Sequence, residues 1–343
     1  MTPVRLPEIA ARYAGLRVAV VGDFCLDRYL EIDPARTERS IETGRPVHNV
    51  VGVRAQAGAA GTILNNLVAL GVGTLHVVGF CGEDGEGFEL RRALAALPGV
   101  RLEGFRSTPE RRTFTYCKPL VLEPGRLPLE LDRFDSKNWT PTPRALQEQV
   151  AAHLLELAPE LDALMLMDQV DAAETGVVTG LVRAAAGEAA GARPGLITLA
   201  DSRRGLQGFP PLGFKMNAAE LAALAGVPPP LAPVEVKRHA AALAVRNGQP
   251  VFVTLSEQGI VGATPTGAVE HVPAWPVRGP IDIVGAGDAV SANLLTALAA
   301  GATLREAMSL AMAAASIVIH QLGTTGTATV AQIREMWTAH ESD

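Results

Sequence analysis

The sequence of 343 residues contains few cysteines and few aromatic residues, and it has no long basic or apolar runs. Its three cysteines, Cys25, Cys81 and Cys117, stand far apart without C-x-x-C spacing, which excludes a disulfide framework and a cysteine-based zinc site. No basic run exceeds two residues and the net charge is −6, so neither nucleic acid nor an anionic membrane is expected as a main partner.

The seven histidines form no clustered pattern such as H-E-x-x-H, and no apolar run approaches the roughly 18 residues that a membrane-spanning helix needs. The N-terminus also lacks the charged and then apolar segments of a signal peptide. These absences, with isolated cysteines that suit a reducing compartment, predict a soluble cytoplasmic protein. Hydrophobic residues make up 48% of the chain and aromatic ones 4%, so a sizeable core would consist mainly of Ala, Leu and Val.

Apolar runs typical of buried strands alternate with helical segments along most of the chain. We expect strands at residues 17–22, 74–80, 163–167, 195–200 and 250–254. We expect helices at residues 62–70, 86–97, 143–158, 173–190, 234–247, 286–300 and 303–320. This alternation predicts an α/β fold with a doubly wound, mainly parallel sheet and right-handed crossovers.

Two segments outside this alternation, residues 29–55 and 100–135, are irregular and contain short strand-like stretches. They predict a small second sheet, a lid formed discontinuously, on a single domain that spans residues 1–343. The exposed edges of such a sheet would favour a homodimer through the lid.

The stretch from residue 281 to residue 298, I-D-I-V-G-A-G-D-A-V-S-A-N-L-L-T-A-L, is the most informative one. Its β-branched run ends at Gly285, and a helix follows without a break, so the helix N-terminus can bind an anion through free N–H groups and the helix dipole. Asp288 would then place a carboxylate beside that anion. Three interpretations are open: a general base next to a phosphoryl group, an acid that simply suits a first helical turn, or a dinucleotide-binding turn.

Several of the predicted strands are followed directly by polar residues. Because open parallel sheets bind ligands beyond the carboxyl ends of their strands, we expect these side chains to line one site. For the first strand, the alternative is that the acids cap a turn. The residues are Asp23, Asp27, Asp168, Asp201, Thr254 and Ser256.

The segment F-K-M-N-A-A-E places Asn217 and Glu220 three residues apart at the start of a short helix. At this spacing their side chains share one face and could act together on a ligand. They also match a capping box, in which Asn217 caps the helix and Glu220 is its partner.

Taken together, these motifs resemble the PfkB, or ribokinase-like, family of sugar kinases over residues 16–335. The family signature D-T-x-G-A-G-D is matched by D-I-V-G-A-G-D at 282–288, N-x-x-E by 217–220, the Gly-Gly signature by 57–61 and the nucleotide-side turn by 254–259. Within the family, the chain is most similar to the D-glycero-D-manno-heptose 7-phosphate kinases, through V-V-G-D-F-C-L-D-R-Y at 20–29 and the run at 311–324.

The resemblance implies a ribokinase-like three-layer α/β/α fold and ATP-dependent transfer of the γ-phosphoryl group to a hydroxyl of a sugar or sugar phosphate. Asp288 is the implied general base, and the helix start at Gly285, Ala286 and Gly287 is the implied anion hole. Asn217 and Glu220 would organise Mg²⁺ and the phosphates, Glu220 through water.

The resemblance also implies the remaining contacts. Thr254, Ser256 and Gly259 would line the nucleotide side and Ala313 the adenine pocket. Asp23, Asp27, Gly58 and either Asn65 or Asn66 would lie on the sugar side. Asp282 would hold a monovalent cation such as K⁺, as in some relatives.

The chain departs from the family pattern at the sugar side and beside the anion hole. Ile283 and Val284 stand where the signature has threonines, and Ala57 replaces the first glycine of the Gly-Gly motif. After Asp168 the chain reads Gln-Val-Asp where the heptose kinases carry a lysine. These changes bear on sugar specificity and on K⁺ dependence, while the anion hole and the base are intact.

Two other function classes are weighed against the kinase. A ribokinase-like protein that binds nucleotide or sugar with little catalysis would explain the altered Gly-Gly motif. A dinucleotide-binding oxidoreductase would use the V-G-A-G-D-A-V turn, but no strand with a terminal acid follows about twenty residues later, as that fold requires.

Overall fold

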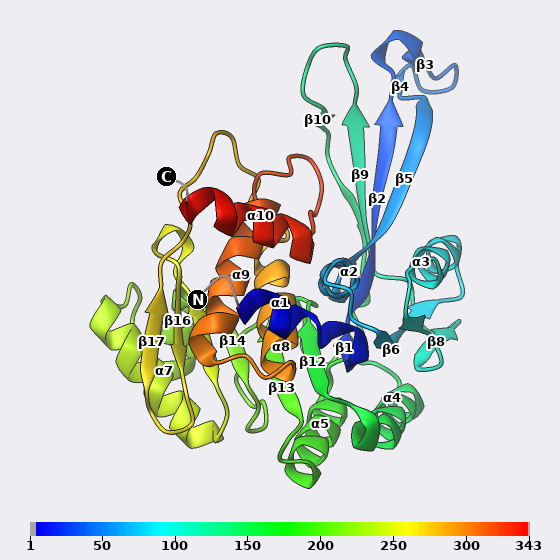
Figure 1. Cartoon of the computed structure of the whole chain (residues 1–343). Helices are drawn as coiled ribbons and strands as arrows, with labels where there is room; N and C mark the ends of the chain where they lie inside the picture. The colour runs from blue at the N-terminus through cyan, green and yellow to red at the C-terminus, as the bar shows by residue number, and fades with distance from the viewer. Residues whose placement is uncertain (1–4, 342–343) are drawn as a thin grey trace.

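The computed structural model describes residues 5–341 as a three-layer α/β/α body from which a smaller sheet projects (Figure 1). Residues 1–4 and 342–343, the ends of the domain predicted from the sequence, lie outside the described residues. Within the described chain, no helix is long and apolar enough to cross a membrane.

A ten-stranded sheet forms the middle layer, in the order β17-β16-β15-β14-β13-β12-β1-β6-β7, with β8 also paired to β6. The strands from β14 through β12 and β1 to β6 are parallel, and β16 and β17 extend the sheet as antiparallel strands. Their bounds are β1 Arg17–Gly22, β6 Thr74–Gly82, β7 Val100–Arg101, β8 Phe105–Thr108, β12 Ala163–Asp168, β13 Ile197–Ser202, β14 Phe214–Asn217, β15 Val251–Thr254, β16 Ile260–Ala263 and β17 Val269–Val272.

Helices cover both faces of this sheet, because its apolar strands are buried on both sides. One face packs on the helices α1 Arg5–Ala10, α2 Ala60–Ala69, α3 Gly85–Ala95, α8 Ala286–Ala299, α9 Leu304–Val318 and α10 Val330–Glu341. The other face packs on α4 Arg144–Leu157, α5 Gly180–Ala192, α6 Ala218–Ala225 and α7 Pro233–Asn247.

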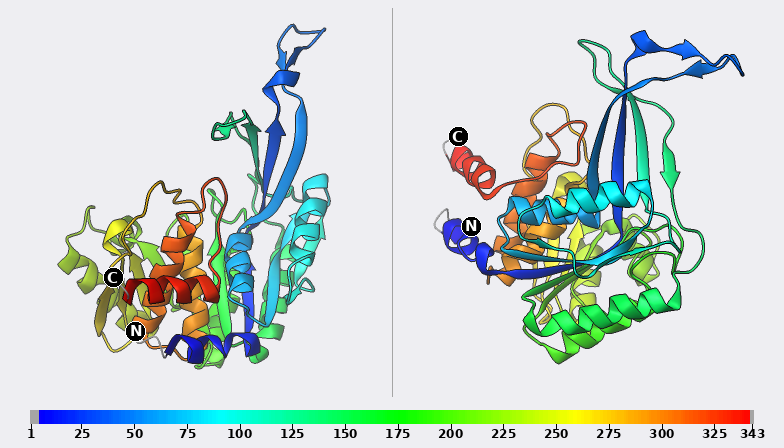
Figure 2. Two further views of the ribbon diagram at one scale, coloured as in Figure 1. Left: turned by 45° about the horizontal axis from the view of Figure 1, so that its top comes forward. Right: turned by 90° about the vertical axis from the view of Figure 1, so that its right-hand side faces the viewer.

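The second, small sheet has the order β10-β9-β2-β5, with β11 paired to β9. Its strands are β2 Phe24–Ile32, β5 Val50–Ala59, β9 Thr115–Val121, β10 Leu129–Glu130 and β11 Phe134–Ser136, and a ribbon of β3 Glu38–Arg39 and β4 Pro46–Val47 lies at its tip. Figure 2 shows this sheet standing out from the body. A single residue, Asp23, separates β2 from β1, and α2 follows β5 directly.

The small sheet has two unlike faces, because successive side chains of a strand point to opposite sides. On β2, Asp27 and Tyr29 belong to one face, and the register with Tyr116 and Lys118 of β9 extends this polar side, here called the inner face. Leu30 belongs to the other side, the outer face, opposite Val53 of β5 and Pro119 of β9. The outer face is mostly apolar and exposed in part, with Val53 50%, Leu129 62% and Phe134 68% exposed, while Leu26 and Ile32 of the same face are buried.

Two sequence expectations differ from the structure. Residues 100–108, which the sequence places with the small sheet, pair as β7 and β8 with β6 of the large sheet. The helix expected at 173–190 begins only at Gly180, because residues 169–179 form a loop whose backbone bonds to side chains outside it. β-branched residues near Val177 favour extended structure over a helical turn.

Candidate active site

The N-terminus of α8 is a helix start without a side-chain cap. Gly285 has a φ of 83°, a left-handed conformation that glycine adopts without a Cβ penalty, and α8 begins at the next residue. No side chain caps this end in the part of the chain that the structure describes. Ala286 N donates to Ile283 O at 3.2 Å, so the following N–H groups of the first turn and the positive end of the helix dipole are what this helix start offers to an anion.

Asp288 lies half-buried in the first turn of α8. Burial raises the pKa of its carboxyl group to about 7, while the charge of Lys215 lowers it and the charges of Asp201 and Asp27 raise it. A carboxyl group with a pKa near neutrality can take up a proton and release it again near pH 7. The helix start thus combines an anion-binding surface with a candidate general base.

A buried lysine, to which the motifs gave no role, lies beside this helix start. Lys215 Nζ on β14 is 2.8 Å from Asp201 Oδ2 on β13, and Ser291 Oγ of α8 donates to the same oxygen at 3.2 Å. Burial alone would lower the pKa of Lys215, but the Asp201 carboxylate outweighs it, so the pKa is raised and the ammonium stays charged. A Cβ on Gly287 would lie 3.1 Å from Nζ, so this cation lies beside the anion-binding surface. The signal available in the sequence is a lysine inside an otherwise apolar strand.

Asn217 and Glu220 form the capping box of α6. Asn217 Oδ1 accepts from Glu220 N at 2.9 Å, and Glu220 Oε2 accepts from Asn217 N at 2.8 Å. Burial is the main cause of the raised pKa of Glu220. The second carboxylate oxygen of Glu220 takes no part in the box, so a water-mediated contact to Mg²⁺ fits the donor set, since Mg²⁺ usually takes one or two carboxylates with phosphate oxygens. Within the described residues, no group of three or more His, Cys, Asp or Glu side chains could hold a metal ion.

The residues expected on the nucleotide side come from neighbouring elements. Thr254 of β15 stands opposite Asn217 of β14 and donates to Met216 O at 3.4 Å. Gly259 has a φ of 91°, and a Cβ there would collide with Val272 O, so the turn after β15 needs glycine for its own geometry. Ser256 also has a positive φ of 52°. Ala313 is completely buried in α9, so its side chain is part of the core.

Asp27 lies on the inner face of the small sheet, 5% exposed, and is close enough to Asp288 to raise its pKa. Burial raises the pKa of Asp27, and Lys118, whose Nζ is 3.9 Å from its carboxylate, lowers it. Gly58 stands on the neighbouring strand β5, and a Cβ there would collide with Asp27 Oδ2 and lie 2.8 Å from Cys25 Sγ. The structure therefore brings Asp27 and Gly58 together near Asp288.

The two asparagines of α2 differ in surroundings. Asn65 Nδ2 donates to Ala57 O at 3.2 Å and its side chain is partly accessible. Asn66 is completely buried and donates to Thr62 O at 3.0 Å and to Gly326 O at 3.5 Å. Of the pair, only Asn65 has the exposure that a contact with a sugar would need.

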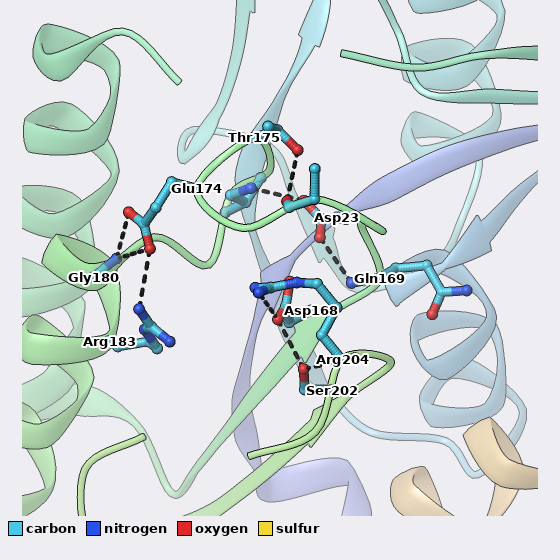
Figure 3. Close-up of polar contacts among 11 residues, drawn as sticks. Asp23, Asp168, Gln169, Glu174, Thr175, Gly180, Arg183, Ser202 and Arg204 are labelled. Carbon is cyan, nitrogen blue, oxygen red and sulfur yellow. Dashed lines mark hydrogen bonds and ion pairs between the residues drawn. The ribbon is translucent and has the colours of Figure 1, made fainter. Parts of the chain in front are cut away.

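Asp23 lies at the carboxyl end of β1, as expected, but its carboxylate bonds to the backbone. Oδ2 accepts from Gln169 N at 2.8 Å and Oδ1 from Val177 N at 2.7 Å, and the residue is 4% exposed. Burial, and then the charge of Asp168, raise its pKa to about 6. Figure 3 shows Asp23 beside Gln169, and Asp168 with its partner Arg204.

Asp282 lies just before the anion-binding helix start. Its Oδ1 accepts from Val284 N at 3.0 Å, and its Oδ2 accepts from Gly323 N at 3.4 Å. Ile283 and Val284 are 73% and 49% exposed, so two apolar side chains border the place where the family signature has hydroxyls. A monovalent cation here would find the carboxylate and backbone carbonyls as ligands.

Comparison with known proteins gives a family match over most of the chain. A family model described as pfkB family carbohydrate kinase matches residues 17–330. The "Bifunctional protein HldE" of Pectobacterium atrosepticum is 34% identical over 331 residues, which cover 94% of this chain and 62% of that protein. The protein of the same name from Gluconobacter oxydans is 30% identical over 315 residues, which cover 90% and 62%. The chain thus spans about three fifths of the length of these curated relatives.

Solved structures with the same fold include a ribokinase of Arabidopsis thaliana complexed with ribose and ATP, with a TM-score of 0.66 and 19% identity over 94% of this chain and 98% of that chain. Phosphofructokinase-2 of Escherichia coli in complex with potassium gives a TM-score of 0.71 and 18% identity over 96% and 99%. At this identity the likeness concerns the fold, and it confirms the expected three-layer architecture with a small separate sheet.

Proposed function

This chain belongs to the pfkB family of carbohydrate kinases, and from that premise we propose that it transfers the γ-phosphoryl group of ATP to a hydroxyl of a sugar or sugar phosphate. The observation that carries the proposal is Asp288. A carboxyl group with a pKa of about 7 occupies the first turn of an uncapped helix, beside the place where a phosphoryl group would bind. This position suits a base that takes the proton of the attacking hydroxyl.

In the proposed step, Asp288 accepts the hydroxyl proton as the sugar oxygen bonds to the γ-phosphorus. The bond from that phosphorus to the β–γ bridging oxygen breaks, and ADP leaves with the electron pair. The N–H groups at the start of α8 stabilise the oxygens of the moving group, which gain preorganised donors without rearrangement of solvent. The Lys215 ammonium adds a fixed positive charge at the same place.

The nucleotide would lie along the turns that follow β14 and β15, lined by Asn217, Thr254, Ser256 and Gly259. Mg²⁺, when bound, neutralises charge on the phosphates and orients them for in-line transfer. Glu220 would hold this ion through water with its second carboxylate oxygen.

The acceptor would lie between Asp288 and the inner face of the small sheet. Asp27 accepts hydrogen bonds from its hydroxyls, and Gly58, which has no Cβ, leaves room for the Asp27 carboxylate. Lys118 lies 3.9 Å from Asp27, and Arg133 also lowers the pKa of Asp27, so two cations border this space. Positive charge here suits a phosphorylated sugar, and heptose 7-phosphate, the substrate of the branch that the motifs resemble, is the first candidate.

The test is a screen of acceptors, with ADP release and product mass measured for ribose, fructose, fructose 6-phosphate, ribose 5-phosphate and heptose 7-phosphate. We expect one acceptor-dependent activity. Asp288→Asn should lower kcat by a factor on the order of 10² to 10⁴ while ATP still binds. Glu188→Gln, which alters an exposed carboxylate on α5, is the matched control and should keep the wild-type rate.

Two outcomes would contradict this assignment. Turnover by Asp288→Asn at the wild-type rate would show that another group is the base. Binding of ADP by calorimetry without turnover on any acceptor would favour the alternative, a ribokinase-like protein that binds nucleotide or sugar with little catalysis.

We also propose that Asp282 is a ligand of K⁺. If so, the wild-type rate in KCl exceeds the rate in NaCl, and Asp282→Asn removes the difference. Equal wild-type rates in the two salts would exclude K⁺ activation. The apolar Ile283 and Val284 should keep the stimulation small, because they supply no hydroxyl ligand.

A homodimer through the small sheet is the last part of the proposal. β5 is an edge strand of this sheet, with Val50 45% and Val51 50% exposed, and it adjoins the apolar outer face. A second copy presents the same edge and the same face, so two copies could cover each other. Light scattering should give a dimer that Val53→Glu dissociates, while Val245→Glu on α7 leaves it intact. A wild-type monomer at micromolar concentration would refute the proposal.

A further inference from the structure

The loop between β12 and α5, residues 169–179, is held by hydrogen bonds from several directions. Arg111, 5% exposed, donates to Thr175 O at 2.6 Å, and Thr142 Oγ1 donates to Gly176 O at 2.7 Å. Glu174 has a positive φ of 62°, and its carboxylate accepts from Gly180 N at 3.0 Å. A non-glycine residue keeps such a conformation only when its surroundings fix it, so this loop is rigidly placed.

Asp23 is the central support of this loop. Its two carboxylate oxygens accept backbone N–H groups from the two ends of the loop, Gln169 and Val177, as Figure 3 shows in part. Gly176 packs so closely that a Cβ there would collide with Oδ1. Burial raises the pKa of Asp23 and the backbone N–H groups counteract that rise, so the carboxylate is matched to these donors.

The loop carries the polar side chains of Gln169 and Asp171 to the base of the small sheet. Asp171 forms ion pairs with Lys137 at 2.7 Å and with Arg203 at 3.2 Å. Tyr116 has a pKa of about 12, raised chiefly by burial, and lies close to Gln169, Arg203 and Asp171. Since Tyr116 stands directly opposite Asp27 in the register of β9 and β2, the loop borders the inner face beside Asp27.

We propose that Asp23 is a positioning residue, which fixes the 169–179 loop, and with it Gln169 and Asp171, against the inner face without contacting the acceptor. Each of its oxygens accepts a backbone N–H group and the residue is 4% exposed, so its carboxylate is directed at the loop and offers little surface to a ligand. Asp27, four residues later on β2, is the carboxylate that faces the acceptor. The inference rests on the proposed function only for the identity of the site that the loop borders.

The first experiment needs no ligand. Hydrogen–deuterium exchange of peptides covering residues 169–179 is compared between the wild type, Asp23→Asn and Gly176→Ala. In Asp23→Asn, the NH₂ group of the new side chain faces a backbone N–H group, so two donors meet and one hydrogen bond is lost. In Gly176→Ala, the added methyl group pushes the loop away from Asp23. Both variants should therefore speed amide exchange in the loop about tenfold or more. Gly191→Ala, in a helical position with open space around it, is the control and should leave the rates unchanged. Wild-type exchange in Asp23→Asn would overturn the proposal.

The second experiment uses the acceptor identified by the screen. Both variants should raise KM for the acceptor about tenfold while KM for ATP stays within about twofold, and their combined effect should be smaller than the product of the two, because they act on one contact. A normal KM in Gly176→Ala with faster loop exchange would show that the loop does not serve the acceptor. If the screen finds no acceptor, the proposed function fails, but the exchange experiment still decides the role of Asp23.

Discussion

The two ends of the proposed site, the phosphoryl end and the acceptor end, differ in how the chain assembles them. The phosphoryl end consists of one short segment, 285–288, and a lysine on the adjacent strand β14, so few parts of the chain must meet. The acceptor end combines the start of β2, Gly58 of β5, strand β9 and the 169–179 loop, which are far apart in the sequence. A helix N-terminus supplies anion binding through its backbone alone, whereas recognition of a sugar needs side chains from several elements. The first end should therefore govern kcat and the second should govern KM for the acceptor.

Among the variants that test this difference between the two ends, Lys215→Met at the phosphoryl end should have the largest effect on stability and rate. Asp201 would keep a buried, unpaired charge, which costs about 3–5 kcal/mol of the free energy of unfolding, and Asp288 would lose the cation that lowers its pKa. Urea unfolding measures the loss, and kcat should fall with it. The double variant Lys215→Met/Asp201→Asn should regain most of the stability but not the rate. Full activity in the double variant would remove Lys215 from the phosphoryl end.

Gly58→Ala tests the acceptor end. The added methyl group would collide with the Asp27 carboxylate and displace it, at a cost of about 1–3 kcal/mol, so KM for the acceptor should rise about tenfold or more. Steady-state kinetics with a fixed ATP concentration measures the change. Gly195→Ala, where the space is open, should not alter it. A fall in kcat with unchanged KM would break the proposed division between the two ends.

The pH dependence of Asp288 gives a smaller effect with a defined sign. Because the base must be ionised, kcat should fall as pH drops below about 7, and this limb should vanish in Asp288→Asn. The raised pKa also means that the folded state holds this proton more tightly than the unfolded state. The ionised carboxylate therefore costs stability, and this cost grows as pH rises from the ordinary value of 3.8 to about 7. Thermal unfolding should show Asp288→Asn to be the more stable protein at pH 8, with a difference that disappears near pH 4.

The smallest effect is expected at Ala59, where β5 passes into α2. Ala59 has a φ of 54° and a ψ of −116°, a conformation that favours glycine. Ala59→Gly should raise the free energy of unfolding by about 1 kcal/mol, because the strain of the Cβ is removed. Chemical denaturation measures it, with Ala57→Gly, a site without positive φ, as the control that should not gain stability. Equal changes at the two positions would show that φ is not the cause.

The sequence predicts the phosphoryl end better than the acceptor end for a physical reason. Asp288 and the glycines before it lie within one segment, and local rules describe a helix start. No local pattern predicts a role for Lys215, because nothing near it in the sequence shows that Asp201 of the neighbouring strand β13 neutralises it. Asp23 was expected at the sugar, since its place after β1 is visible in the sequence, but the partners that engage it, Gln169 and Val177, depend on the path of a distant loop.

Outside the site, too, the sequence predicts local structure better than contacts between distant segments. The alternation of strands and helices was sufficient for the parallel sheet, because each βα unit buries its own apolar face. The sequence places residues 100–108 with the small sheet, whereas they pair with β6, because the sequence of a short strand does not reveal its partner. The helix expected from 173 starts at Gly180, because contacts with Asp23 and Arg111 hold residues 169–179 as a loop and their β-branched side chains favour extended structure.

The small sheet can rotate as a unit about its junctions with the body at Asp23 and Ala59, which together form the fulcrum of that rotation. Strands β2 and β5 enter the body at these two points, which are joined by the hydrogen bond from Ala60 N to Asp23 O at 3.1 Å. The nine residues of β2 give an arm of about 30 Å at roughly 3.3 Å per residue, so a rotation of about 10° at the fulcrum moves the tip by about 5 Å. Asp27, only four residues from Asp23, would move by about 2 Å in the same rotation. A spectroscopic label on the ribbon of β3 and β4 would therefore magnify changes at the site that are too small to measure there directly.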